Sequence, residues 1–192
     1  MTQISEPTIR AGSMQGKRIR LRILERSDIV TTAAWINSDY ISDIMGYPPT
    51  MPLAQQYDWF DKLKDDRSRL VFAICMREDG RHIGNAALGN IDYISRHAMF
   101  SIFIADPADQ TQGLGTEAAK LLLGFAFNRL NLNKVHLRAS TRFEAAIRMY
   151  EKLGFVKEGV MRQHYYANGV YEDKLIYSIL RSEFRSANSS EL

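Results

Sequence analysis

The chain has 192 residues, 45% of them hydrophobic, which is enough to bury the core of a single domain. Lys and Arg number 25 against 22 Asp and Glu, and a net charge of +3 is too small to indicate a nucleic-acid partner. The single cysteine, Cys75, excludes an internal disulfide and favours the cytoplasm. No stretch is long and apolar enough for a membrane helix, and the four histidines lack the paired spacing of a zinc site, so we expect neither a membrane nor a metal.

The predicted domain covers residues 17–184. Residues 1–16 lack the apolar core of a signal peptide and contain many small and polar side chains, and residues 185–192 have a similar composition. We therefore expect a flexible segment at each end of one domain.

The first half of the domain begins with a strand at about residues 19–23, followed by a helix that Ser27 can cap. The prolines of "MGYPPTMP" interrupt helical structure, and the spacing of "LAQQYDWFDKL" resumes it. "RLVFAICM" and "HIGNAALGNI" are predicted strands, joined by a hairpin turn at Asp79-Gly80. This half therefore contains an antiparallel strand pair.

The central segment is a crossover unit. "AMFSIFIA", residues 98–105, is an apolar run typical of a strand covered on both faces, and it leads into the loop "DQTQGLG". The next segment has apolar residues at helical core spacing, and "KVHLRAS" is again a strand. Strand, loop, helix and strand in this order predict two parallel neighbours.

The last segment begins with Thr141 and Glu144, which have the spacing of a capping box before the helix "FEAAIRMYEKL". Gly154 ends that helix, and two strands with a turn at Asn168-Gly169 follow. The predicted fold class is therefore α/β (mixed, α+β type). Apolar and aromatic residues in the C-terminal strands would suit edge pairing into a homodimer.

Gly113 and Gly115 lie where the loop enters the helix, a position that suits a phosphate group because helix-terminal amides are unpaired there. The alternative is a tight turn without a ligand. A dinucleotide fingerprint fits only partly, because Ala118 occupies the place of its third glycine and no acidic residue ends the next strand. No Gly-Lys-Ser/Thr follows, which excludes a Walker loop.

Two longer motifs carry a family resemblance. Residues 110–115 have the form Q-x-x-G-x-G, and "AAIRMYEKLGF", residues 145–155, resembles the second hallmark of the GNAT N-acetyltransferases. The resemblance extends over about residues 19–184. Within the family, the chain is similar to the subgroup that acetylates ribosomal-protein N-termini, polyamines, amino sugars or antibiotics. It implies a central mixed sheet of about six to seven strands flanked by about four helices, acetyl-CoA as cofactor, and a small-molecule or peptide amine as acceptor.

The resemblance also implies where coenzyme A binds. The loop would hold its pyrophosphate through backbone amides, and the pantetheine arm would pair with the central strand like an additional strand. The candidate cofactor-binding residues are Ile102, Phe103, Ile104, Ala105, Gln110, Thr111, Gln112, Gly113, Leu114, Gly115, Thr116, Phe143 and Tyr150.

Tyr150 is the candidate catalytic residue, a general acid for the departing thiolate, because it matches the tyrosine of the family motif. Its alternative role is to fill space in the core. Met99 or Phe100 stands where many relatives have a glutamate base, so proton removal could run through water or through Asp39 or Asp43. His97 lies nearby in sequence, but we expect it to be exposed.

Phe143 replaces the asparagine that relatives usually carry before this helix, and it could stack on the cofactor, wall off the acceptor or cap the helix. Acceptor recognition is assigned to the irregular segment "DYISDIMGYPPTMP" and the last hairpin, with Tyr47, Tyr165 and Tyr166 as candidate wall residues. The acidic residues there could attract a cationic amine or be merely solvated: Asp39, Asp43, Glu172 and Asp173. Because Met99 and Phe143 depart from the pattern, the alternative function is a non-catalytic acyl-CoA-binding or regulatory module.

Overall fold

The computed structural model describes residues 14–46, 50–167 and 169–188, and in them eight strands form one sheet in the order β1-β2-β3-β4-β5-β6-β8-β7. The strands are β1 (Met14–Gln15), β2 (Ile19–Ile23), β3 (Leu70–Met76), β4 (His82–Asp92), β5 (His97–Ile104), β6 (Lys134–Ser140), β7 (Val156–Ala167) and β8 (Val170–Leu180). The helices are α1 (Ile29–Ile36), α2 (Asp39–Met45), α3 (Leu53–Leu63), α4 (Leu114–Asn128), α5 (Glu144–Lys152) and α6 (Arg181–Asn188), with short 3-10 turns η1 (Arg26–Asp28) and η2 (Pro107–Asp109).

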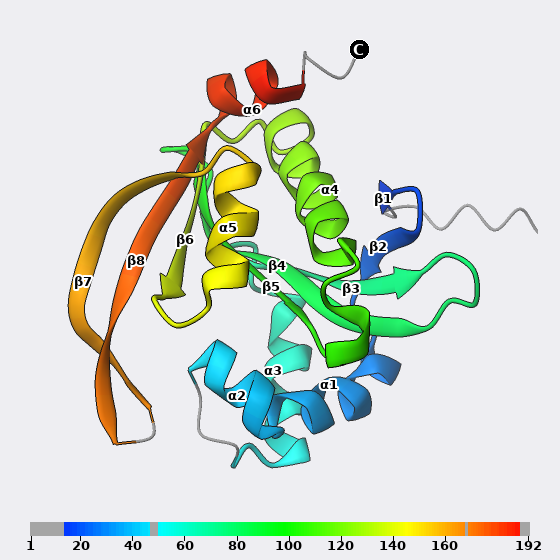
Figure 1. Ribbon diagram of the computed structural model, residues 1–192. Coiled ribbons are helices and arrows are strands. Elements are labelled where there is room, and N and C mark those ends of the chain that lie inside the picture. Colours follow the sequence, from blue (N-terminus) through cyan, green and yellow to red (C-terminus); the bar gives the residue numbers. More distant parts are fainter. Residues whose placement is uncertain (1–13, 47–49, 168, 189–192) are drawn as a thin grey trace, which may run out of the picture.

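The sheet is antiparallel except between β5 and β6, which run parallel and are connected through α4. The predicted crossover unit and both hairpins are therefore confirmed. The sheet has eight strands, one more than the upper end of the expected six to seven. Figure 1 shows the long hairpin of β7 and β8 bending away from the rest of the sheet.

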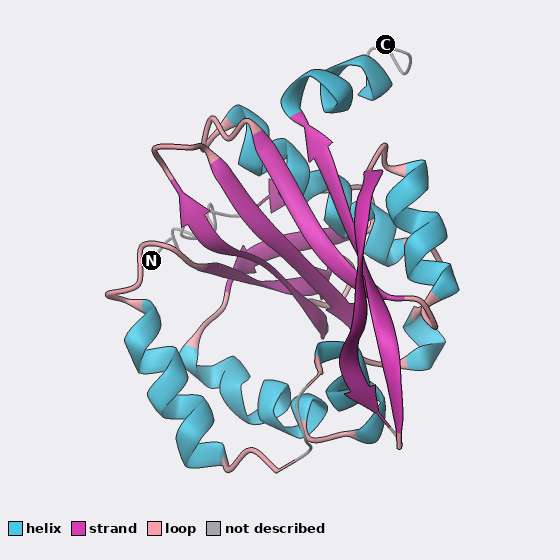
Figure 2. Ribbon diagram, turned by 90° about the vertical axis from the view of Figure 1, so that its left-hand side faces the viewer, coloured by secondary structure: helices cyan, strands magenta, loops and turns pink. Residues whose placement is uncertain are grey.

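Helices cover the sheet on both sides (Figure 2). The main core lies between the sheet and the helices α4 and α5, where Phe72, Leu122, Phe127 and Val135 are fully or almost fully buried. The helical spacing of apolar residues in α4 produces this contact, because side chains three and four positions apart share one face.

A smaller apolar cluster lies on the opposite side of the sheet, under α1 and α3. It contains Leu24, Ile29, Ala73 and Cys75, with Phe60 of α3 packed against it. Burial raises the pKa of the Cys75 thiol and outweighs the opposing effect of nearby Arg22. Cys75 is thus a buried strand residue, as its apolar surroundings in the sequence predict.

A polar network anchors α1 to the sheet. The Arg22 guanidinium donates to both carboxylate oxygens of Asp28, at 2.6 and 2.7 Å. The His82 ring contacts the Asn85 side-chain oxygen at 2.8 Å and packs edge-on against Trp35, with 4.7 Å between ring centroids. These contacts fix the position of α1 and, through the short turn after it, of α2.

The segment "DYISDIM" is the helix α2, although the sequence analysis treated it as irregular. The Ser38 hydroxyl caps its start by accepting from the Ile41 amide at 3.4 Å. Gly46 ends it with a φ of 76°, which glycine adopts without strain. Ser27 and Thr141 are not the caps that the sequence predicts: Glu25 and Asp28 form a reciprocal cap at η1, and α5 follows Phe143 without a side-chain cap.

The predicted ends of the domain overlap ordered elements. β1 lies within the predicted N-terminal segment, and α6 extends to Asn188. None of the helices in the described residues has the length and apolar character needed to span a membrane. In that same part of the chain, no three His, Cys, Asp or Glu side chains are arranged to hold a metal ion.

Candidate active site

The site is built around the place where β5 and β6 separate. Their pairing runs from His97 and Lys134 to Met99 and His136, and no further pairs follow among the described residues. β5 nevertheless continues to Ile104 and β6 to Ser140. The facing backbone edges of the two strands are thus open over their C-terminal halves, which leaves room for an extended ligand to pair with β5.

The glycine loop lies at the end of β5. Gly113 has a φ of 77° and precedes the first residue of α4, Leu114. No backbone carbonyl of the described residues accepts from the amides of Gly113 to Thr116, and the first such bond of the helix start is from Glu117 to Gly113, at 3.1 Å. Unpaired amides at the positive end of a 15-residue helix are suited to an anion.

Side chains from distant parts of the sequence hold this loop in place. The Arg18 guanidinium donates to the Gln112 carbonyl at 2.8 Å and lies 3.3 Å from a Glu117 carboxylate oxygen. Arg81 donates to both Asp109 oxygens, at 2.6 and 3.0 Å, and these bonds lower the pKa of Asp109. Arg18 therefore brings a positive charge to the loop, and the sequence analysis assigned it no function.

Two glutamines in the Q-x-x-G-x-G segment, Gln110 and Gln112, stabilise the loop with side-chain hydrogen bonds. The Gln110 side-chain amide donates to the Ile104 carbonyl at 3.0 Å, and its oxygen accepts from the Tyr40 hydroxyl at 2.8 Å. The Gln112 side chain donates to the Ala108 carbonyl at 2.7 Å. Gln110 thus connects α2, the loop and the end of β5.

A cavity of about 720 Å³ occupies the opening between β5 and β6. Ten of the thirteen candidate cofactor-binding residues line it: Ile102, Phe103, Ile104, Gln110, Thr111, Gly113, Gly115, Thr116, Phe143 and Tyr150. Ala105, Gln112 and Leu114 do not; Leu114 is buried in the core, and the Ala105 amide donates to the Ile83 carbonyl at 2.9 Å.

Tyr150 belongs both to the core and to the cavity wall. Its ring packs against Phe100 and Phe155, with centroid distances of 6.3 and 5.7 Å, and the side chain is 8% exposed. The residue also lines the cavity. Burial raises the pKa of Tyr150 to about 12, so that its hydroxyl keeps its proton at neutral pH.

Of the candidate bases, Asp43 alone lines the cavity, and it lies 3.6 Å from the Arg142 guanidinium. His97 is 3.8 Å from Asp92 and is not part of the cavity wall. Phe100 belongs to the core, and Asp39 is exposed at the start of α2.

The candidate acceptor residues separate into different locations. Tyr165 lines the cavity, and its hydroxyl donates to the Asp43 carbonyl at 2.9 Å. Tyr166 is 59% exposed and packs against Tyr171 rather than facing the cavity. Tyr47 lies outside the described residues. Phe143 lies beneath the Arg142 guanidinium, 4.9 Å from it.

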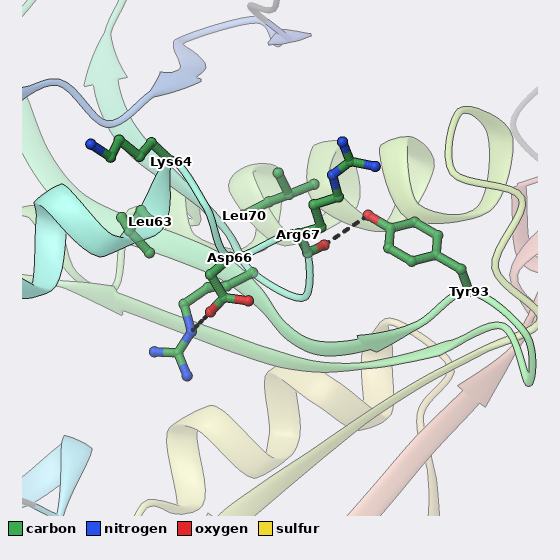
Figure 3. A pocket seen from close by; sticks show the side chains of 7 residues that line it. Leu63, Lys64, Asp66, Arg67, Leu70 and Tyr93 are labelled. Atoms are coloured by element: carbon green, nitrogen blue, oxygen red, sulfur yellow. Dashed lines mark hydrogen bonds and ion pairs between the residues drawn. The ribbon is translucent and has the colours of Figure 1, made fainter.

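A second hollow, of about 550 Å³, lies away from this site between the end of α3 and the turn after β4 (Figure 3). Asp66 is 3.9 Å from Arg69, and the Tyr93 hydroxyl donates to the Arg67 carbonyl at 3.1 Å. Hydrogen bonds from Ser68 lower the pKa of Asp66. Asp66 and the Tyr93 hydroxyl therefore already have partners, and the hollow contains none of the candidate site residues.

An open strand edge, a helix start with unpaired amides and a protonated tyrosine lie in one cavity, an arrangement that suits an acyl-CoA-dependent transferase. A family model described as "Acetyltransferase (GNAT) domain" matches residues 18–156, and the chain belongs to this family. Spermidine N(1)-acetyltransferase of Escherichia coli (strain K12) is 32% identical over 167 residues, covering 86% of this chain and 88% of that protein. A putative ribosomal N-acetyltransferase of Bacillus subtilis (strain 168) is 34% identical over 106 residues, covering 55% and 57%.

Solved structures agree with this family. The crystal structure of spermidine N-acetyltransferase from Vibrio cholerae in complex with CoA and spermine has a TM-score of 0.84 and 28% identity, covering 88% of this chain and 99% of that one. The chain is therefore an acetyl-CoA-dependent N-acetyltransferase that acts on an amine. The predicted fold, enzyme class and cofactor are confirmed, and the non-catalytic module is not supported.

Proposed function

We propose that the cavity between β5 and β6 is the active site and that Tyr150 is the proton donor for transfer to the primary amine of a small molecule. The observation that carries this assignment is the loss of pairing beyond Met99 and His136, which opens β5 in the cavity that the glycine loop and Tyr150 also line. The family supplies the reaction, and this geometry supports the proposed roles of the residues.

Different elements of the chain would bind the pyrophosphate and the pantetheine arm of the cofactor. The amides of Gly113 to Thr116, with the α4 dipole behind them and Arg18 beside the loop, suit the pyrophosphate. The open edge of β5, near Ile102 to Ile104, suits the amide groups of the pantetheine arm. When bound, acetyl-CoA supplies the activated acetyl group at the end of this arm.

Two groups of the protein would act on the reacting atoms. A backbone N–H on the open edge of β5 would stabilise the oxyanion that forms on the acetyl carbonyl. The Tyr150 hydroxyl would give its proton to the departing sulfur. Since Asp43 is engaged by Arg142, we propose that the acceptor amine loses its proton to water rather than to a carboxylate of the cavity.

The experiment is thiol release from acetyl-CoA with polyamines, amino sugars, aminoglycosides, amino acids and short peptides, for the wild type and for Tyr150→Phe. We expect at least one class of amine to be acetylated by the wild type. The variant should lose about 100-fold or more in kcat, since general acid catalysis contributes that much. Its affinity for acetyl-CoA should be unchanged; a fully active variant would exclude Tyr150 as the acid.

We also propose that the protein self-associates along the hairpin of β7 and β8. β7 is an edge strand, and Val160, Tyr166 and Tyr171 on this hairpin are 44%, 59% and 64% exposed. A dodecameric structure of the spermidine N-acetyltransferase from Vibrio cholerae has a TM-score of 0.77 to this chain. Native mass would measure the oligomeric state, and a monomer at micromolar concentration would contradict the proposal.

We further propose a cytoplasmic location, which the single buried cysteine, Cys75, supports.

A further inference from the structure

The wall of the cavity carries more positive than negative charge, because Arg138, Arg142, Lys152 and Lys174 line it against Asp43 and Glu144. Arg138 of β6 and Lys174 of β8 both line it. The two strands pair antiparallel, with Lys174 opposite Ser140 and Arg138 opposite Ile176. Positions 138 and 140 lie on one face of β6, and directly paired residues share a face, so both cations lie on the same face of the sheet.

The nearby carboxylates are already engaged. Glu172 accepts from the Ser140 hydroxyl at 2.6 Å and lies 3.4 Å from Arg142, and Asp43 lies 3.6 Å from the same guanidinium. Among the described residues, no carboxylate lies within ion-pair distance of Arg138 or Lys174. Acidic residues therefore neutralise Arg142 and leave the other two cations uncompensated.

Arg142 itself has donor capacity left. Its Nη2 atom is buried and has no hydrogen-bond partner within the described residues. Its guanidinium is held between the Phe143 and Tyr165 rings, at 4.9 and 5.5 Å from their centroids. A half-buried guanidinium with a buried, unused donor atom in a cavity wall is suited to a ligand that accepts hydrogen bonds.

Lys174 is held in a fixed position. Its ammonium lies over the Tyr165 ring, 4.6 Å from the centroid, and 3.7 Å from the place that a Cβ on Gly46 would occupy. Burial lowers the pKa of Lys174, and the charge of Arg138 lowers it further, because the two positive charges repel each other. An anion between them would relieve both effects.

A ligand in this cavity would therefore be selected by its charge. A polyamine would bring additional ammonium groups against Arg138 and Lys174, whereas an anionic group would pair with them. We infer that the acceptor of this enzyme carries a carboxylate or phosphate close to its amine, and that Arg138 and Lys174 bind this anionic group. The inference rests on the proposed function, because it names the acceptor of the same site.

The first test compares matched acceptors in the thiol-release assay. An amino acid is compared with its carboxamide, and glucosamine 6-phosphate with glucosamine; spermidine serves as the polycation. We expect kcat/KM to be about 10- to 100-fold higher for the anionic member of at least one pair, as loss of a charge-assisted contact implies. The carboxamide has the less basic amine, so a larger fraction of it is neutral and reactive at neutral pH. A preference for the carboxylate would therefore run against the supply of neutral amine.

The second test changes the cations one at a time. Lys174→Gln and Arg138→Gln should raise KM for the anionic acceptor about 10-fold or more, with little change in kcat or in KM for acetyl-CoA. The exposed Arg138 also permits Arg138→Glu, which should reduce or reverse the preference between the charged and uncharged acceptor. Lys64→Gln, in the distant hollow of Figure 3, is the matched control and should change none of these constants.

The outcomes separate this inference from the proposed function. If no amine accepts an acetyl group, the proposed function fails. If spermidine or the uncharged amines are acetylated as efficiently as the anionic ones, the function holds and the inference is wrong. A rise in KM for acetyl-CoA in Lys174→Gln and Arg138→Gln, with the acceptor constants unchanged, would also overturn it by assigning these cations to the cofactor.

Discussion

Among single residues, Tyr150 and Gly113 are central to the proposed site. Tyr150 is part of the core and of the cavity wall at once. The motif around it identified the residue, whereas its surroundings could not be predicted, because Phe100 and Phe155 reach it only through the fold. Gly113 was predictable from its place before an apolar helix, and its φ of 77° explains why glycine stands there.

The pH dependence of transfer should reflect the high pKa of Tyr150, which burial raises to about 12. The hydroxyl then remains protonated over the working range, and the rate should rise with pH as more of the acceptor amine becomes neutral. No alkaline decline from this group is expected below about pH 11. The measurement is kcat against pH with the enzyme's preferred amine. A reversible decline with an apparent pKa near 9 would contradict the assignment.

Replacing Gly113 should weaken cofactor binding. In Gly113→Ala the Cβ would meet Arg18 Nη2 at 3.4 Å, and the left-handed backbone would cost roughly 1 kcal/mol or more. We expect affinity for acetyl-CoA, measured by calorimetry, to fall about 10-fold as the loop changes shape. Gly124→Ala, in the same helix with open space at its Cβ, is the control and should leave affinity unchanged. Equal affinities in both variants would remove the loop from the binding site.

At the scale of elements, the sequence predicts strongly patterned segments and misses short ones. The apolar run of β5, the helix α4 and the turn at Gly80 follow from local patterns that the tertiary structure retains. The helix α2 was missed because it has only seven residues and precedes a proline-rich segment. Its signal was the pair Ser38 and Gly46, a capping hydroxyl and a helix-ending glycine placed around it.

The anchor of α1 should make stability depend on pH. Burial opposes ionisation of Asp28, but hydrogen bonds from Arg22 and the Glu25 amide outweigh it and lower the pKa of Asp28. A lowered pKa contributes stability that is present above the unfolded value, near pH 4, and is lost as pH falls through the folded value.

The variant Asp28→Asn tests this anchor. We expect the free energy of unfolding at pH 7, measured with denaturant, to fall by about 3 kcal/mol, because Arg22 loses its buried partner. The difference between the variant and the wild type should shrink below about pH 4. Arg26, at an exposed ion pair with Asp61, offers the matched control Arg26→Gln, which should change stability little. A pH-independent loss in Asp28→Asn would contradict the ionic role.

At the scale of the whole molecule, the site is assembled from segments that are far apart in the sequence. Tyr40 from α2 and Lys174 from β8 line the cavity between β5 and β6, and Arg18, just before β2, contacts the glycine loop. The residues of the two family motifs were predictable, since each motif is local. The supporting and acceptor-side residues were not, because their proximity depends on strand order and on where β5 and β6 stop pairing.

The most direct measurement is a crystal structure with coenzyme A bound. We predict that its pyrophosphate lies on the amides of Gly113 to Thr116 and that its pantetheine arm runs along the open edge of β5. The sulfur should lie within about 3.5 Å of the Tyr150 hydroxyl, the distance that proton transfer through a hydrogen bond requires. Coenzyme A bound outside this cavity, or with its sulfur far from Tyr150, would contradict the proposed site.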